Sequence, residues 1–174
     1  GKVGTQVARI IDEYPVWLAF FGSLLLSLIA VMGTATVGRD AALYIDIAQQ
    51  VTEQGPDVAW ATFDWPWFSL LLAATHSILR LPLELSAYLW CGLFFAGTSA
   101  LMVDCVRQRS PDVTRWACLV MLAMPAVNAF RNDIIRECGF WFFCTLALWL
   151  ALRWPARGGW LRAAFIHMAI FAAA

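Results

Sequence analysis

The chain has 174 residues, of which 61% are apolar and 14% are charged, and its formal net charge is zero. Soluble domains contain about 45–50% apolar and about 25% charged residues, so this composition indicates a membrane protein. The zero net charge gives no reason to expect a nucleic-acid partner. The five cysteines lack the spacing of a metal site, which favours structural thiols over metal ligands or disulfides.

Both ends of the sequence predict a longer protein. It begins Gly-Lys and stops within an apolar run that starts at Phe165. No cleavable signal peptide is predicted, because the first apolar run is too long and no small-residue cleavage site follows it. We therefore expect residues 1–174 to be the N-terminal part of one transmembrane domain.

The first half of the chain predicts one membrane span and three helices at the membrane surface. Residues 1–14 have the spacing of a short amphipathic helix that lies on a membrane. Residues 15–37 are uncharged and long enough to cross the roughly 30 Å hydrocarbon layer. Residues 40–54 and 66–80, at about 15 residues each, are too short to cross and are predicted to lie along the interface.

Four further apolar runs complete the prediction. They cover residues 83–104, 113–130, 134–152 and 160–174. Short charged turns separate them, as in a chain that crosses the bilayer repeatedly. The predicted fold is therefore an all-α, polytopic transmembrane protein with two interfacial helices in its first outer loop.

The basic residues predict the orientation of the chain. One set of loops holds Lys2, Arg9, Arg107, Arg109, Arg115, Arg153, Arg157 and Arg162, and the other holds only Arg39, Arg80, Arg131 and Arg136. Lysine and arginine favour the cytoplasmic side. We therefore expect a cytoplasmic N-terminus, with residues 38–82 and 131–137 on the outer face of the membrane.

Asp40 is the leading candidate for a catalytic or ligand-binding residue. Asp40 stands at the start of an interfacial helix, where it could instead act only as the N-cap. Asp64 opens the second interfacial helix and has the same two interpretations. Asp46 is six residues from Asp40 and is expected on a solvated face, and His76 is expected to be an ordinary polar residue of its helix.

The turn 131–137 is the second candidate. Arg131 and Arg136 stand on the same predicted side as Asp40, and an arginine fork matches the oxygens of a phosphate. The alternative is that these arginines pair only with Asp133 and Glu137 in the same turn. The neighbouring aromatic residues, including Trp65 and Trp67, are either interface anchors or a stacking surface.

These motifs together resemble a known enzyme family. The pattern Asp40-x-x-x-Tyr44-x-x-x-Ala48, followed by Phe63-Asp64-Trp65-Pro66, resembles the N-terminal part of GT-C glycosyltransferases. The most similar subgroup contains protein O-mannosyltransferases and lipid A aminoarabinose transferases. The turn from Arg131 to Glu137, which enters Phe140-Trp141-Phe142-Phe143, is similar to the second outer loop of that subgroup. Family members usually carry a second acid beside the first, whereas Arg39 and Ala41 flank Asp40 here.

The resemblance implies an enzyme of the cell envelope. It would move a sugar from a polyprenyl-phosphate donor to an acceptor of unknown identity on the outer face of the inner membrane. Asp40 would act as general base, and Arg131 and Arg136 would hold the lipid phosphate. Further substrate-binding residues would be Tyr44, Asp64, Trp65, Trp67 and Glu137. Membrane lipids are the other expected partners; no metal ligand and no certain cofactor is assigned, although the family leaves room for a divalent metal.

The alternative is a non-catalytic membrane subunit or a lipid-handling transporter. In that case the arginine and aspartate pairs would be salt bridges, and the interfacial helices would be anchors. A transporter of polar solutes more often carries ionisable groups within its spans. The predicted spans hold almost none, which favours the enzyme.

Overall fold

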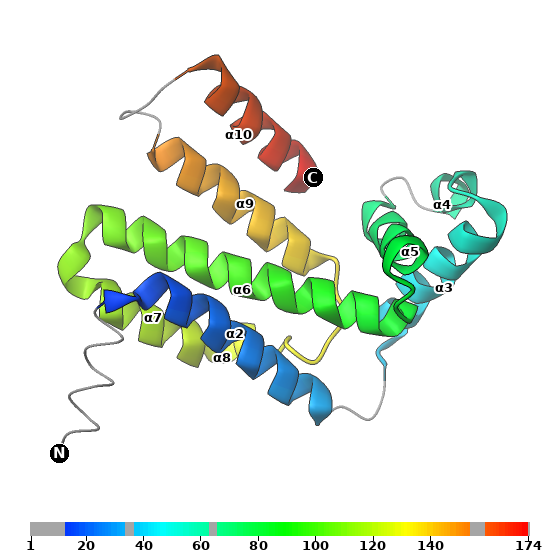
Figure 1. Ribbon diagram of the computed structural model, residues 1–174, viewed down its shortest axis with the longest axis horizontal. Helices are drawn as coiled ribbons and strands as arrows, with labels where there is room; N and C mark the ends of the chain where they lie inside the picture. The colour runs from blue at the N-terminus through cyan, green and yellow to red at the C-terminus, as the bar shows by residue number, and fades with distance from the viewer. Residues whose placement is uncertain (1–12, 34–36, 63–65, 154–158, 174) are drawn as a thin grey trace.

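The computed structural model describes residues 13–33, 37–62, 66–153 and 159–173, and every regular element in this part of the chain is helical. The prediction of an all-α fold is confirmed (Figure 1). The elements are α2 (Pro15–Met32), α3 (Arg39–Gln54), α4 (Asp57–Thr62), α5 (Trp67–Leu79), α6 (Leu83–Arg109), the 3₁₀ turn η1 (Pro111–Val113), α7 (Thr114–Ala123), α8 (Pro125–Asn128), α9 (Glu137–Leu152) and α10 (Trp160–Ala173). The predicted amphipathic helix over residues 1–14 falls almost entirely outside the described residues.

Among the described helices, α2 and α6 are the two that are long and apolar enough to cross a membrane. They lie side by side, with small residues at their contact: Ser23 and Ser27 of α2 are buried, and Ser99 of α6 donates a hydrogen bond to Ser23 Oγ (3.3 Å). Small residues allow two helix backbones to approach closely. The opposite face of α2 exposes Trp17 and Phe21, as expected of a surface that lipid covers.

The remaining predicted spans differ from the observed helices. Residues 113–130 do not form one helix: α7 ends at Ala123, Met124 is extended (ψ 112°), and Pro125 opens the short α8. Proline disfavours a helical conformation in the residue before it, and this explains the break. Helix α9 begins at Glu137 rather than 134. Helices α9 and α10 have 16 and 14 residues and extend about 24 and about 21 Å, less than the roughly 30 Å hydrocarbon layer. That the chain crosses the membrane five times therefore stays a prediction.

Helices α3, α4 and α5 gather at one end of the long helices, to the right in Figure 1. The bounds of α3 and α5 agree with the predicted helices 40–54 and 66–80, whereas α4 was not predicted. The Ser69 hydroxyl of α5 donates to the Tyr44 carbonyl of α3 (3.1 Å), and the Tyr44 and Phe68 rings meet edge to face. Arg80, in the left-handed conformation (φ 58°), ends α5 and turns the chain into α6.

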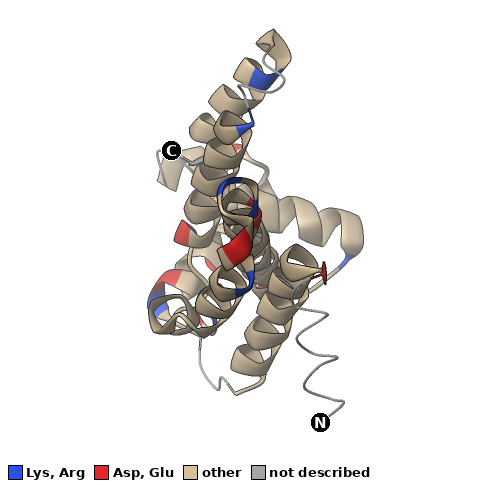
Figure 2. Ribbon diagram, turned by 90° about the vertical axis from the view of Figure 1, so that its left-hand side faces the viewer, with Lys and Arg blue, Asp and Glu red and all other residues tan. Residues whose placement is uncertain are grey.

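The larger apolar core lies where this group meets the long helices. It contains Phe68 and Leu72 of α5, Phe95 of α6 and, from the turn before α9, Ile134. The turn 129–136 therefore packs against the same end of the molecule as α3 and α5, as the predicted loop grouping requires. Figure 2 shows that most of the helical ribbon carries neither acidic nor basic residues.

Candidate functional site

Asp40, Tyr44, Arg136 and Glu137 share one neighbourhood at this end of the molecule. Asp40 and Tyr44 are four residues apart on α3, which places them on one face of the helix. Burial raises the pKa of the Tyr44 phenol, the positive charge of Arg136 lowers it, and the carboxylates of Glu137 and Asp40 raise it further. The structure thus brings together four of the residues that the sequence predicted, from segments about 90 positions apart.

The Asp40 carboxylate is exposed in the first turn of α3. The N-cap position belongs to Gly38, and no side chain makes a capping hydrogen bond there. The interpretation of Asp40 as the N-cap is therefore wrong for this helix. Its negative charge lies instead near the positive end of the helix dipole, an arrangement that favours the helix.

Arg136 and Glu137, whose charges both reach the Tyr44 phenol, form a loose ion pair. The distance from Arg136 Nε to Glu137 Oε1 is 3.8 Å, and the two side chains are 44% and 52% exposed. An exposed pair of this kind contributes at most about 1 kcal/mol. The guanidinium therefore stays accessible to an anion that arrives from solvent or from the membrane surface.

Arg131 lies elsewhere, and the prediction that it faces outward toward a lipid phosphate is wrong. Its side chain is buried, with 3% exposure, and reaches back to α2. Nη1 donates to the Ser23 carbonyl (3.0 Å) and to the hydroxyls of Ser23 and Ser27 (both 2.9 Å), and Nε donates to Asn128 Oδ1 (2.6 Å). The guanidinium also lies over the Phe95 ring, whereas Nη2 has no hydrogen-bond partner. Neutral acceptors thus hold this charge inside the bundle, and the predicted pairing with Asp133 or Glu137 does not form.

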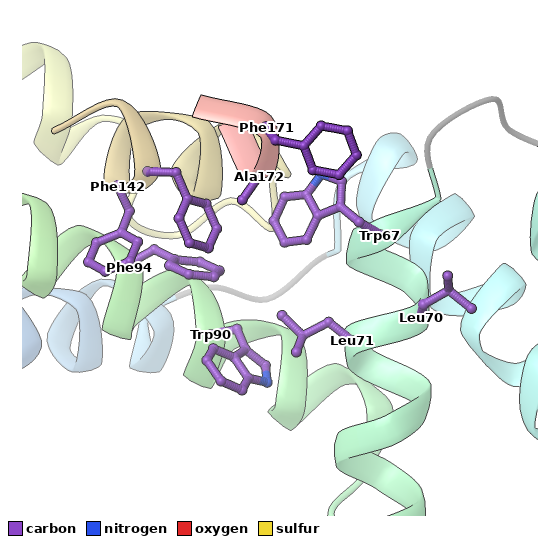
Figure 3. Close-up of a pocket in the computed structure, with 9 residues that line it drawn as sticks. Trp67, Leu70, Leu71, Trp90, Phe94, Phe142, Phe171 and Ala172 are labelled. Carbon is purple, nitrogen blue, oxygen red and sulfur yellow. The ribbon is translucent and has the colours of Figure 1, made fainter. Parts of the chain in front are cut away.

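A large apolar cavity opens beside the same end of the molecule (Figure 3). Its volume is about 700 Å³, and nearly all of its surface is carbon. The residues that line it come from α5, α6, α9 and α10: Trp67, Leu70, Leu71, Trp90, Phe94, Phe142, Phe143, Phe171 and Ala172. The polar edge of Trp90 is satisfied by Thr75 Oγ1 (2.8 Å), so the cavity offers aromatic faces rather than hydrogen bonds.

Trp67 links the cavity to the polar residues. Its indole packs directly on Gly139, two residues after Glu137, where a side chain would collide with the ring. The same ring meets Phe94 edge to face, with centroids 6.1 Å apart. Trp67 is therefore a wall of the cavity rather than an interface anchor alone. Asp64 and Trp65, the other two residues predicted in this segment, lie outside the described residues.

The described part of the chain contains no group of three or more His, Cys, Asp or Glu side chains that would hold a metal ion. Asp40 and Glu137 are the two carboxylates whose charges raise the pKa of the Tyr44 phenol. As a pair they supply fewer ligands than a structural metal site uses. The observed arrangement is a carboxylate and a guanidinium beside an apolar cavity.

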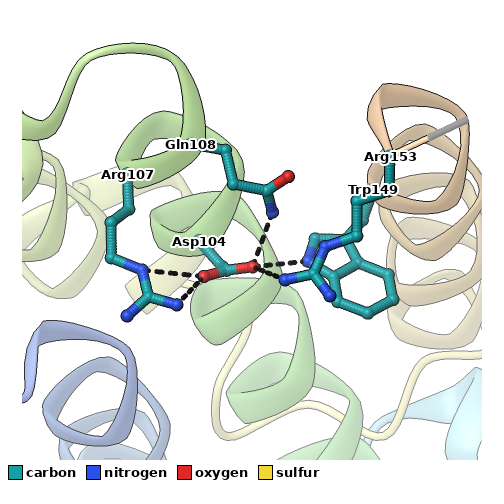
Figure 4. A network of polar contacts seen from close by, with 5 residues as sticks. All are labelled: Asp104, Arg107, Gln108, Trp149 and Arg153. Atoms are coloured by element: carbon teal, nitrogen blue, oxygen red, sulfur yellow. Dashed lines mark hydrogen bonds and ion pairs between the residues drawn. The ribbon is translucent and has the colours of Figure 1, made fainter. Parts of the chain in front are cut away.

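Sequence reasoning missed a second polar cluster at the opposite end of α6 (Figure 4). The buried Asp104 carboxylate accepts hydrogen bonds from the side chains of Arg107, Gln108, Trp149 and Arg153. Arg153 also stacks on Trp149, 4.0 Å from the ring centroid. These contacts join the end of α6 to the end of α9. All lone pairs of the carboxylate are occupied, so the cluster is structural.

No protein-family model, no curated protein and no solved structure matches this chain. The functional argument therefore depends on the side chains and their arrangement.

Proposed function

We propose that the chain belongs to a membrane glycosyltransferase of the GT-C type, which moves a sugar from a polyprenyl-phosphate donor to an acceptor at the outer face of the inner membrane. One observation carries this proposal: Asp40, Tyr44 and Arg136 lie in one neighbourhood, at the end of the molecule where the apolar cavity opens. A base and a phosphate-binding cation are the two groups that such a transfer needs.

The proposed chemistry assigns each group a role. The acceptor hydroxyl or amine forms a bond to the anomeric carbon of the sugar while the bond from that carbon to the phosphate oxygen breaks. The Asp40 carboxylate takes the proton of the acceptor. The Arg136 guanidinium donates hydrogen bonds to the phosphate and stabilises the charge that grows on it. Glu137 keeps Arg136 oriented, and Tyr44 presents its neutral phenol as a donor to substrate oxygens.

The apolar cavity supports a lipid-linked donor. A polyprenyl chain is a hydrocarbon with regularly spaced double bonds, and aromatic faces such as those of Trp67 and Phe94 suit it. Trp67, which lines the cavity, packs on Gly139, and Gly139 is two residues from Glu137 and three from Arg136. A donor whose chain lies in the cavity would therefore carry its phosphate near the Arg136 guanidinium.

A lipid-handling membrane protein without catalysis is the second candidate. The observation that favours it is the nearly complete absence of polar surface inside the cavity. In that case Arg136 would recognise a lipid head group and Asp40 would be a solvated surface residue. The two candidates agree on lipid binding and differ on the need for the Asp40 carboxylate.

The test is to replace Asp40 with Asn and, separately, with Ala in the full-length protein. Sugar transfer is measured in membrane vesicles with a panel of polyprenyl-phosphate hexoses and pentoses. Because the Asp40 side chain makes no capping hydrogen bond, both variants should keep a Tm close to that of the wild type. Their free energy of unfolding should change by less than about 0.5 kcal/mol. Loss of a general base should lower kcat by about 10²–10⁴-fold.

Asp46→Asn is the matched control, because Asp46 is an exposed acid of the same helix that accepts a hydrogen bond from Gln50 (2.8 Å). It should leave transfer unchanged. Arg136→Gln should raise KM for the donor, as expected for loss of a phosphate contact. If both Asp40 variants retain most of the transfer activity while Arg136→Gln weakens lipid binding, the lipid-handling alternative is correct and the enzyme proposal is not.

A further inference from the structure

Two cysteines from distant parts of the chain lie in contact beneath the candidate site. Cys91 of α6 and Cys138 of α9 are 47 positions apart in the sequence, and their Sγ atoms are 3.4 Å apart. Both side chains are almost completely buried, with 2% and 1% exposure. Both sulfurs also approach the carbonyl oxygen of Ile135, at 3.6 and 2.8 Å. The remaining cysteines, Cys105, Cys118 and Cys144, make no such contact among the described residues.

The predicted location of these two cysteines, outside the cytoplasm, favours their oxidation. Cys138 directly follows the turn 131–137, which the distribution of basic residues predicts to lie outside the cytoplasm. Cys91 lies two turns into α6 from the same end. Disulfides form and persist outside the cytoplasm, where protein thiols are exposed to oxidising partners. We propose that Cys91 and Cys138 form a disulfide that fastens the start of α9 to α6.

The distance between the two sulfurs requires only a small adjustment. A disulfide has an S–S distance of about 2.05 Å, so the two sulfurs must approach by about 1.4 Å. Each thiol loses one proton, and together the two thiols lose two electrons. A disulfide-bearing protein oxidant accepts the electrons through a mixed disulfide, and its own disulfide becomes two thiols. Because both sulfurs are buried in the finished fold, this exchange takes place before α9 docks on α6.

The bond would act on the residues next to it. Cys138 lies between Glu137, which pairs with Arg136, and Gly139, on which Trp67 packs. A covalent link at this position fixes the first turn of α9 against α6 and so fixes the distance between the polar residues and the apolar cavity. This inference goes beyond the proposed function and shares with it only the predicted orientation of the chain in the membrane.

The test is thiol mapping of the full-length protein as cells make it. Cells are quenched in acid, the protein is denatured, free thiols are blocked with a maleimide, and peptides are analysed by mass spectrometry before and after reduction. Cys118 is the matched control, because it is equally buried (0% exposure) and contacts no other cysteine among the described residues. Cys105, Cys118 and Cys144 should react without reduction, whereas Cys91 and Cys138 should appear as one linked pair that reacts only after reduction.

Variants provide a second measurement. Cys91→Ala and Cys138→Ala should each leave the other cysteine reactive and lower Tm by roughly 5–10 °C, and the double variant should lower it no further. Cys144→Ala should leave the linked peptide intact. If Cys91 and Cys138 react with maleimide as readily as Cys118 in the denatured, unreduced wild type, the proposal is wrong. This result needs no variant that must fold, and it leaves the Asp40 test of the glycosyltransferase unaffected.

Discussion

The Asp104 cluster offers the most direct test of how the long helices are held together. Asp104 is 5% exposed, and its carboxylate accepts five hydrogen bonds from four side chains. Asp104→Asn keeps the shape of the side chain but removes the negative charge. It also replaces one acceptor oxygen with an NH₂ group, which cannot accept the hydrogen bonds that the neighbouring N–H groups donate to Asp104. We expect this change to loosen the contact between the ends of α6 and α9.

The stability that Asp104→Asn loses depends on how exposed each hydrogen-bond donor to Asp104 is. A hydrogen bond to a charged group contributes about 1.5–3 kcal/mol when it is shielded from water. The Arg107 and Arg153 side chains are 51% and 39% exposed, so water replaces much of what each loses. Trp149 has only its indole N–H to donate, at 2.7 Å from Oδ2. The sum is a loss of about 2–3 kcal/mol in the free energy of unfolding.

The partners should also rank in a definite order. Arg153→Gln removes a contact between two helices and a stacking contact on Trp149, and should cost about 1–2 kcal/mol. Arg107→Gln removes a contact within α6 that is half exposed, and should cost less than about 1 kcal/mol. This ranking distinguishes the loss of hydrogen bonds to Asp104 from a general effect of charge, because Arg153→Gln and Arg107→Gln each remove one positive charge.

The assay is thermal unfolding of the purified protein in detergent, followed by tryptophan fluorescence. At about 2–4 °C per kcal/mol, Asp104→Asn should lower Tm by about 5–10 °C. Asp112→Asn is the matched control, since Asp112 is an exposed acid in η1 at the same end of the molecule. It should change stability by less than about 0.5 kcal/mol. Equal Tm values for Asp104→Asn and Asp112→Asn, or a larger loss for Arg107→Gln than for Arg153→Gln, would refute this reasoning.

Two further predictions concern the candidate site and the orientation of the chain. Gly139→Ala places a methyl group against the Trp67 ring. It should destabilise the protein by about 1–3 kcal/mol and change its tryptophan fluorescence. Gly33→Ala is the control, because the new methyl group makes only ordinary contacts there, and it should change neither stability nor fluorescence. An unchanged spectrum and Tm for Gly139→Ala would show that the ring does not pack there. Single cysteines at positions 57 and 112, in a background without native cysteines, should react with an impermeant thiol reagent from opposite sides of the membrane; reaction from the same side would overturn the predicted orientation.

The sequence predicted the parts of the fold that depend on local chemistry. Length and charge located α3 and α5 to within one residue at each end, because three acids make α3 too polar for a span and Arg80 and Pro82 end the apolar run of α5 after about 15 residues. The break at Met124 had a sequence signal in Pro125, which the apolar character of the run outweighed. The start of α9 at Glu137 came later than predicted because residues 131–136 form a turn that packs into the core.

The contacts that the sequence did not predict join distant residues. The acceptors of Arg131 Nη1 belong to serines more than 100 positions earlier, in a segment that hydropathy describes only as apolar. Trp149 and Arg153 reach Asp104 from more than 40 positions later. The contact between Cys91 and Cys138 likewise has no signature in spacing. In contrast, the proximity of Asp40 to Arg136 followed from the predicted loop grouping, since both belong to loops on one side.

The attachment of Arg131 to Ser23 and Ser27 implies an order of assembly. A guanidinium in an apolar setting without acceptors is unfavourable by several kcal/mol, so residues 131–136 can take their observed shape only when α2 is already beside them. Synthesis from the N-terminus meets this requirement, because α2 leaves the ribosome about 100 residues before Arg131. Helix α2 therefore provides the surface on which the turn that carries Arg136 folds. A shortened chain that begins after α2 would keep every residue of that turn and lose its conformation.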